Sequence, residues 1–248
     1  MNYNELKKGL SPQKLNSYQR FLGCTSDKEL IASYMVLQSL QEKFYLPIQL
    51  VELTLRNNIN AAIYQHLKGK GATNRQANRW YHSVPATQTS KDQVSAAKTK
   101  ANREVKGRPY NHNDVIARLT FGFWIYLLDK PHRLSGAANV DHQLWPYITN
   151  DVFPNRGGKG IPSLFNDLNT LNKLRNRLFH HEPIWMGSGV TSKQDALDML
   201  DKRYELVMNM LGYLSPDKMK LVQSIDMINE FKAHCSMDKF TDYEKLLP

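Results

Sequence analysis

Three side chains near residue 180 are of types that can transfer protons at a phosphate group or donate hydrogen bonds to it. Arg175, Asn176 and His180 lie in the stretch LRNRLFHHEPIW, which runs from Leu174 to Trp185. An imidazole titrates near neutral pH and can act as a general acid or base, and a guanidinium can donate paired hydrogen bonds to phosphate oxygens. Arg175, Asn176 and His180 are therefore candidate catalytic residues.

A helix predicted over residues 163–181 must position these side chains. Its leucines, together with Phe179, form one apolar arc that we expect to face the core. Arg175 projects into the middle of this arc, whereas Asn176 and His180 lie on an adjacent polar stripe. Because five residues separate Arg175 from His180, the two side chains point about 140° apart. One copy of the helix therefore positions them poorly around a single phosphate.

An arginine in an apolar arc needs a partner, because an unpaired buried guanidinium is costly. Glu52 is a candidate, since it projects into the apolar arc of a helix predicted over residues 47–66. Arg56 follows one turn later, with Asn57 beside it. A Glu52–Arg175 or Glu52–Arg56 ion pair that only holds the bundle together explains these residues equally well when they are taken in isolation.

Caps, prolines and hydrophobic spacing divide the chain into helices joined by polar loops. Two helix starts are explicit, Ser11-Pro12 and a capping box of Ser26 with Glu29. No alternation with a period of two competes and no internal repeat is present, so the sequence predicts an all-α bundle. Residues 69–90, rich in Gly, Asn, Thr and Ser, are expected to form a loop. Helices are predicted over residues 12–22, 26–44, 47–66, 90–106, 113–128, 141–152, 163–181, 191–214 and 215–231.

The composition is that of a soluble globular protein, with 41% hydrophobic and 23% charged residues. We expect residues 1–248 to form one all-helical domain, with a core over about 25–214 and a C-terminal helix and tail over 215–248. The tryptophans, including Trp124, Trp145 and Trp185, are expected to pack in the core rather than to stack on bases.

The sequence shows no framework for a metal, a disulfide or a membrane anchor. Cys24 and Cys235 are too few and too far apart for a disulfide framework or a conventional zinc site, so we expect neither a metal nor a cofactor. The longest apolar run, residues 119–128, is too short to cross a bilayer, and the N-terminus lacks an apolar signal core. We therefore expect a cytoplasmic protein that does not contact membranes.

The positive charge is concentrated in the first three quarters of the chain. The formal net charge is +10; residues 1–190 carry 25 Lys and Arg against 13 Asp and Glu, whereas residues 191–248 carry 8 against 10. Residues 68–108 alone hold ten basic residues and two acidic ones. Clustered Lys and Arg replace the counterions of phosphates, so a polyanion such as RNA is the expected partner, and a merely solvated surface is the alternative. The candidate RNA-binding residues are Lys98, Lys100, Arg103 and Lys106.

Three segments, in this order, resemble the Abi-like (AbiD/AbiF) abortive-infection family of the HEPN superfamily. They are ELTLRN at residues 52–57, LTFGFWIYLL at residues 119–128 and RNRLFHHEPIW at residues 175–185. Arg175 and His180 match the R-x4-6-H signature of HEPN ribonucleases, and the resemblance covers roughly residues 25–190. It implies a HEPN-type helical bundle with additional N- and C-terminal helices.

The resemblance also implies a function, namely metal-independent cleavage of RNA that leaves a 2′,3′-cyclic phosphate and a 5′-hydroxyl. The active site would form at a homodimer interface, where two copies of Arg175 and His180 line one cleft, with Asn176 orienting the imidazole or contacting phosphate. Glu52, Arg56 and Asn57 would support the site. The family further implies phage defence or a toxin–antitoxin role, with a protein or RNA antitoxin as a possible partner.

Two interpretations stay open beside the enzyme. A non-catalytic RNA-binding scaffold would keep the same fold, and a nucleotide-binding protein would need a phosphate site for which the sequence offers no P-loop. His181 would help to bind RNA or would simply be a cation that suits the C-terminus of a helix.

Overall fold

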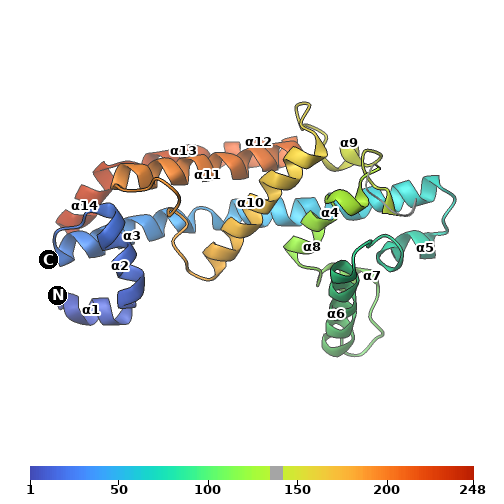
Figure 1. The fold of residues 1–248 in the computed structure, drawn as a ribbon, viewed down its shortest axis with the longest axis horizontal. Coiled ribbons are helices and arrows are strands. Elements are labelled where there is room, and N and C mark those ends of the chain that lie inside the picture. Colours follow the sequence, from blue (N-terminus) through green and yellow to red (C-terminus); the bar gives the residue numbers. More distant parts are fainter. Residues whose placement is uncertain (135–141) are drawn as a thin grey trace. The chain divides into compact units, whose positions relative to one another are not determined.

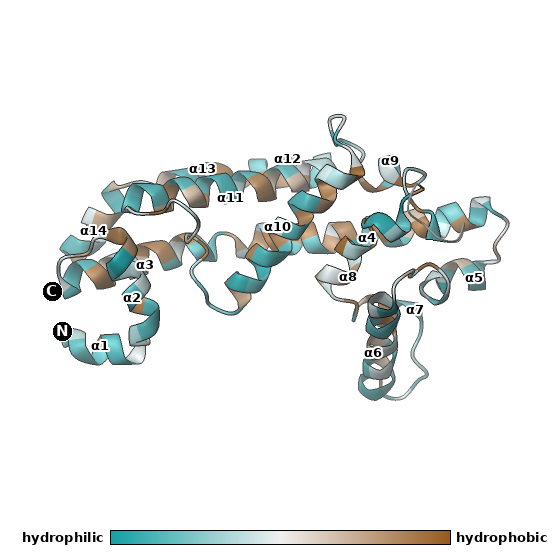
Figure 2. Cartoon of the chain, in the orientation of Figure 1, coloured by the Kyte–Doolittle hydropathy of each residue, from teal (hydrophilic) through white to brown (hydrophobic). Residues whose placement is uncertain are grey.

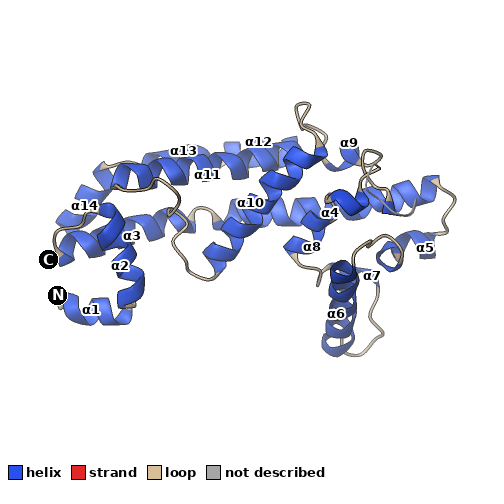
Figure 3. Ribbon diagram, viewed as in Figure 1, coloured by secondary structure: helices blue, strands red, loops and turns tan. Residues whose placement is uncertain are grey.

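The computed structural model describes residues 1–134 and 142–248, and the regular elements within them are helices, with no strand (Figures 1 and 3). This confirms the all-α class. Contacts divide the chain into two compact units. The terminal unit comprises Met1–Gln49, Lys173–Asn209 and Asp217–Pro248, and the central unit comprises Leu50–Asn172 and Met210–Pro216. The expectation that the two units fold together as a single domain stays a prediction.

Three long helices each contribute several residues to both units: α4 (Tyr45–Gly69), α10 (Ile161–Phe179) and α11 (Lys193–Leu214). Each follows its predicted bounds closely, although α4 begins two residues before Pro47. A proline can occupy the first turn of a helix because its missing N–H would have no partner there. None of the described helices is both long enough and apolar enough to cross a membrane.

The terminal unit is built around α3 (Asp27–Glu42), against which α2 (Pro12–Leu22) and α14 (Asp238–Leu246) pack. Its first helix is α1 (Tyr3–Gly9), which the sequence analysis did not predict. The start of α3 is capped as predicted, since Ser26 Oγ accepts a hydrogen bond from the Glu29 amide at 3.1 Å. The Glu29 carboxylate, however, accepts from the Thr25 amide and hydroxyl rather than from Ser26.

Aromatic rings fill the core of the terminal unit. Phe44 meets Tyr204 and Phe231 edge-on, with ring centres 5.3 and 5.6 Å apart, and Tyr204 stacks on Phe231 at 3.8 Å. Phe231 belongs to α13 (Met227–His234), which follows α12 (Pro216–Ser224). The single helix predicted over residues 215–231 is therefore wrong, because Asp226 adopts a left-handed conformation, with a φ of 59°, that a continuous helix cannot contain.

The central unit surrounds buried tryptophans. Trp80 lies against Phe123 and Trp124, with ring centres 6.2 and 5.8 Å away, and its indole donates to Asn60 Oδ1 at 2.8 Å. The core position predicted for Trp124, Trp145 and Trp185 is confirmed, since each is at most 2% exposed. The short helices of this unit are α5 (Asn74–Asn78), α7 (His112–Ile116), α8 (Phe121–Tyr126) and α9 (Thr149–Val152), with 3-10 turns η1 (Trp80–His82) and η2 (Lys130–His132).

Three predicted elements of the central unit are wrong in detail. The loop expected over residues 69–90 contains α5 and η1, because Thr73 and Gln76 form a capping box that starts α5. The helix predicted over residues 113–128 is two helices, α7 and α8, capped separately by Asn111 and Thr120. The helix predicted over residues 141–152 is reduced to α9, and residue 141 lies outside the described residues.

Helix α6 (Gln88–Glu104) is the exposed basic element that the sequence predicted, although it starts two residues earlier, at a Thr87 cap. Figure 2 colours most of it as hydrophilic. Its buried side chains form one narrow stripe that consists of Ser90, Val94, Ala97 and Ala101. Helix α6 contacts α7 and α8. The rest of its surface is open to solvent.

Asn58 joins the ends of two helices in the central unit. Its side-chain amide donates to the carbonyls of Val152 and Leu214, both at 2.9 Å. These are the last residues of α9 and α11, whose terminal carbonyls have no partner inside their own helices. One amide group, with its two N–H donors, thus satisfies two helix ends.

We predict that Asn58→Asp lowers the free energy of unfolding by about 1–3 kcal/mol, because it keeps the shape of the side chain and leaves both carbonyls without a donor. Urea unfolding measures the change. Asn57→Asp is the matched control, since Asn57 is exposed and offers its side-chain oxygen to Arg56, which an aspartate also does. Equal stability of Asn58→Asp and wild type would contradict the capping role.

Candidate active site

The candidate catalytic residues lie at the C-terminal end of α10, within the terminal unit. After Phe179 the chain closes the helix with two backbone hydrogen bonds: the His181 amide donates to the Leu178 carbonyl at 3.1 Å, and the Glu182 amide donates to the Arg177 carbonyl at 2.8 Å. This pair of bonds is a Schellman motif with His181 at the C′ position. His181 is accordingly left-handed, with a φ of 55°.

The same motif ends α4, where the left-handed position is held by glycine. The Gly71 amide donates to the Lys68 carbonyl at 3.0 Å and the Ala72 amide to the Leu67 carbonyl at 3.0 Å, with a φ of 89° at Gly71. Glycine adopts this conformation without a steric penalty, whereas a residue with a Cβ adopts it only at a steric cost. His181 therefore holds a conformation that costs free energy.

The segment after His181 is anchored in the terminal unit. The Ile184 amide donates to Gln41 Oε1 at 2.6 Å, and Arg203 donates to the carbonyls of Ile184 and, at 3.0 Å, Met186. Trp185 is fully buried against Tyr18, with ring centres 5.0 Å apart. These contacts connect the end of α10 to α2, α3 and α11, so the backbone that carries His180 is fixed from both sides.

Arg175 is half-buried rather than buried. Its guanidinium carbon lies 4.3 Å from the centre of the Phe179 ring, and its Nη1 donates to Asn176 Oδ1 at 3.5 Å. Phe179 is 40% exposed, so its predicted core position is wrong. The cause is that Arg175 and Tyr45, instead of core residues, pack on the Phe179 ring. The ring centres of Tyr45 and Phe179 lie 4.9 Å apart.

The structure brings Arg175 and Asn176 together but leaves His180 apart. His180 and Asn176 are exposed, and among the described residues the His180 imidazole has no hydrogen bond or ion pair. This agrees with the divergence expected from the five-residue spacing. The imidazole is therefore accessible to solvent, and its backbone is held while its side chain is not.

An open pocket of about 420 Å³ adjoins the end of α10. Tyr45 and Phe179 contribute exposed aromatic surface to it, and His181, which is also exposed, contributes an imidazole. Tyr45 was not among the predicted site residues, although its neighbours Phe44 and Leu46 make the segment notably apolar. The lining residues are Gln38, Gln41, Glu42, Tyr45, Leu178, Phe179 and His181.

The predicted supporting residues lie in the central unit. Glu52 and Arg56 are half-buried and Asn57 is exposed, so the expectation that Glu52 is buried is wrong. Arg56 Nε donates to Asn57 Oδ1 at 3.2 Å. The pairing of Glu52 with Arg175 joins residues of different units and stays a prediction. Because both are half-exposed, losing such a pair would cost less than the roughly 3–5 kcal/mol of a fully buried one.

The four predicted RNA-binding residues differ in their surroundings. Lys100 and Arg103 lie 4.0 and 3.5 Å from the Glu104 carboxylate. Lys98 is half-buried and Lys106 is exposed, and neither forms an ion pair in the described part of the chain. Glu104 therefore balances part of the positive charge of α6.

Among residues 1–134 and 142–248, no group of three or more His, Cys, Asp and Glu side chains is placed to hold a metal ion.

The chain matches no protein-family model, no curated protein and no solved structure. Kinship with the Abi-like family therefore stays a prediction.

We predict that His181→Gly stabilises the protein by about 0.5–1 kcal/mol, because glycine relieves the left-handed strain while the Schellman hydrogen bonds remain. Gly71→Ala is the matched reverse change and should destabilise by a similar amount. Urea unfolding of both variants measures the two shifts. A loss of stability in His181→Gly would mean that the imidazole makes a contact worth more than the strain.

Proposed function

We propose that the protein is a metal-independent endoribonuclease of the HEPN type, acting in phage defence or as a toxin with an antitoxin. The observation that carries this proposal is the arrangement at the end of α10. Arg175 is held against Phe179, and His180 stands exposed on a backbone fixed by the C-cap. The resemblance of residues 175–185 to the R-x4-6-H segment supports the same conclusion.

The proposed reaction needs a base, an acid and a cation. A base removes the proton of the ribose 2′-hydroxyl, whose oxygen attacks phosphorus; the bond to the 5′-oxygen breaks, and an acid protonates that oxygen. His180 is the residue proposed for proton transfer. Arg175 donates to the non-bridging oxygens, on which charge builds up in the transition state. Asn176 holds the guanidinium through its side-chain oxygen.

Two copies of the chain are proposed to share one active site. A single His180 cannot take and give a proton on both sides of the phosphorus at once, and a two-fold axis would supply the second imidazole. The surface beside the motif is suited to such pairing, because Tyr45 and Phe179, whose ring centres lie 4.9 Å apart, are 51% and 40% exposed. Exposed apolar side chains in one patch are typical of interaction surfaces.

The test is cleavage of labelled RNA in EDTA, with analysis of the product ends. We predict 2′,3′-cyclic phosphate ends for wild type and a loss of at least about a hundredfold in His180→Ala, the usual effect of removing a general acid or base. Arg175→Lys should also lose activity, since lysine lacks the planar fork that donates in pairs. His234→Ala, which removes a histidine on α13 outside the candidate site, is the control.

All three variants should keep the wild-type mass in light scattering, so that lost activity is not lost assembly. Normal cleavage by His180→Ala, or an absolute need for added magnesium in wild type, would rule out the proposed chemistry.

A second function, RNA binding without cleavage, is favoured by α6. Its exposed surface carries the segment of dense positive charge, and the buried stripe that anchors it is narrow. We propose that Lys98, Lys100, Arg103 and Lys106 contact the RNA backbone, whether or not the chain cleaves it.

Replacing these four residues with Gln should weaken RNA binding and flatten its salt dependence, because each lost phosphate contact on a single strand lowers the slope of log K against log salt by about 0.7. The structure refines this expectation: Lys98→Gln with Lys106→Gln should lower the slope more than Lys100→Gln with Arg103→Gln, whose charges Glu104 already balances in part. Filter binding over a range of salt measures both. An unchanged slope in the fourfold variant would mean that these residues do not contact RNA and that α6 is only a solubilising surface.

A further inference from the structure

An open pocket in the central unit gathers positive side chains. Its volume is about 620 Å³, and its walls are the end of α4, the turn that follows, α5 and η1. Small-molecule ligands occupy pockets of this size. Lys70, Arg75, Arg79 and His82 all line it. Lys70, Arg75 and Arg79 belong to the basic segment over residues 68–108, but a pocket among them was not predicted.

The positive charge of this pocket is not balanced by acidic side chains. None of the lining residues is Asp or Glu, and within the described residues Lys70, Arg75 and Arg79 form no ion pair. The arrangement on α6 is different, since Glu104 lies beside both Lys100 and Arg103 there. An open pocket with several cations and no carboxylate attracts anions.

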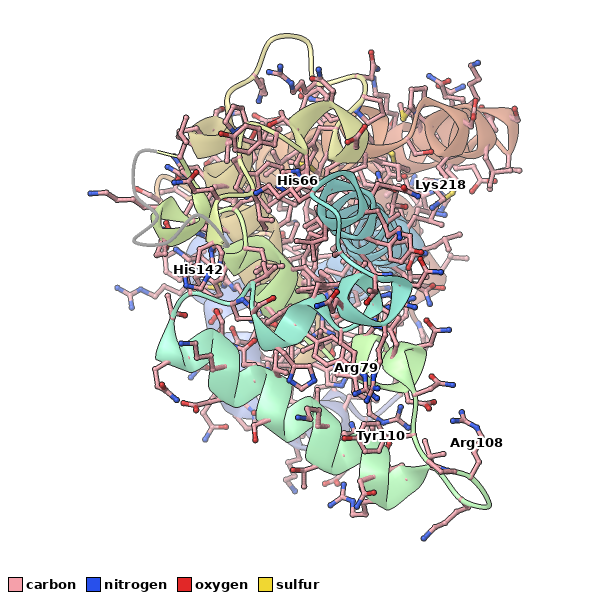
Figure 4. The ribbon with its side chains drawn as sticks, turned by 90° about the vertical axis from the view of Figure 1, so that its right-hand side faces the viewer. His66, Arg79, Arg108, Tyr110, His142 and Lys218 are labelled. Carbon is pink, nitrogen blue, oxygen red and sulfur yellow. The ribbon has the colours of Figure 1, made fainter. Side chains whose placement is uncertain are left out.

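Neighbouring positive charge also affects the pKa of His82. Partial burial, followed by the charges of Lys98 and Arg79, lowers the pKa of its imidazole. Arg79 also acts on the neighbouring Tyr81, where it opposes the effect of burial on the phenol's pKa. Arg79, labelled in Figure 4, therefore lies close enough to His82 and Tyr81 to affect both pKa values.

Two helix ends bring these cations to the pocket. Lys70 follows the last residue of α4, where a cation is favoured by the negative end of the helix. Arg75 lies within α5, and Arg79 is its C-cap. Both are thus at the C-terminal end of this short helix, where its own dipole also favours cations. The convergence of all three cations on one pocket suits a ligand with more than one negative charge.

An exposed aromatic ring lies next to one of the cations, Lys70. Tyr147 is 54% exposed, and the Lys70 ammonium lies 5.9 Å from its ring centre. His66, also labelled in Figure 4, stacks on Tyr147 with ring centres 5.5 Å apart. A tyrosine ring that is accessible beside a phosphate-binding group can stack on a base.

We propose that this pocket binds a nucleoside phosphate, with the phosphate held by Lys70, Arg75 and Arg79 and the base stacked on Tyr147. The site is separate from Arg175 and His180, and it does not require that the chain cleave RNA. A free nucleotide and the phosphorylated 5′ end of an RNA strand present the same chemistry to it.

The test measures binding of AMP, ATP and two 2′-O-methyl oligonucleotides, one with a 5′-phosphate and one with a 5′-hydroxyl. The 2′-O-methyl group removes the hydroxyl that would attack phosphorus, so cleavage cannot interfere and failure of the ribonuclease proposal does not affect the result. We expect saturable binding of AMP, of ATP or of the 5′-phosphorylated oligonucleotide. Arg75→Gln with Arg79→Gln should weaken it at least about tenfold, the scale of lost charge-assisted hydrogen bonds. Tyr147→Leu should weaken it too.

The matched control removes the same charge elsewhere: Arg20→Gln with Lys202→Gln, two exposed residues on α2 and α11. Unfolding midpoints of all variants check that α5 stays folded. Binding of AMP or ATP would identify a free nucleotide as the ligand, and binding of the 5′-phosphorylated oligonucleotide alone would identify an RNA end. The proposal is overturned if no probe binds, if the two oligonucleotides bind equally and neither nucleotide binds, or if the control variant weakens binding as much as the pocket variant.

Discussion

A helix that ends at the protein surface must satisfy its last carbonyls and still direct the chain that follows. At the end of α10 the Schellman hydrogen bonds of His181 and Glu182 satisfy the last carbonyls. The burial of Ile184 and Trp185 then fixes the direction of the chain that follows. The candidate site depends on this constraint, because the side chain of His180 is exposed while its backbone is fixed. A proton-transfer group on a rigid backbone loses less conformational entropy when substrate binds.

Charge balance, rather than total charge, distinguishes the two basic surfaces of the central unit. The segment over residues 68–108 looks uniform in sequence, with ten basic residues. In the structure, Glu104 neutralises part of α6, whereas the pocket beside α5 has no acidic side chain. A local excess of positive potential depends on where the few carboxylates lie, and helix geometry decides that.

The helices of this chain were largely predictable, but the short elements and the exposure of single residues were not. The periodicity of α10 predicted its bounds within two residues, because the apolar arc is long. Thr73 and Gln76 form a capping box, yet the Gly- and Asn-rich composition around them favoured a loop, so α5 was missed. Periodicity gives the direction of a side chain but not the extent of what covers it, which is why Phe179 was expected in the core.

The boundary between the two units was also not predictable from the sequence, because three of its four crossings fall inside α4, α10 and α11 and the fourth falls at the first residue of α12. Linkers are recognised by Pro, Gly and polar residues, and the interior of a long helix has none of these signals. The same positions separate the predicted partners Glu52 and Arg175 into different units, so the sequence could suggest the pair without indicating how each residue is packed.

The exposed stack of Tyr45, Phe179 and Arg175 connects assembly with chemistry in the proposed enzyme. In one copy, water surrounds much of this stack and weakens the field of the guanidinium. Pairing of two copies over the stack would bury aromatic surface, which favours association, and would remove water from Arg175. A guanidinium in a drier site stabilises a charged phosphorane more strongly, since fixed donors act more strongly where the dielectric is low. The burial that holds a dimer together would then also accelerate cleavage, and an isolated copy would be nearly inactive for both electrostatic and geometric reasons.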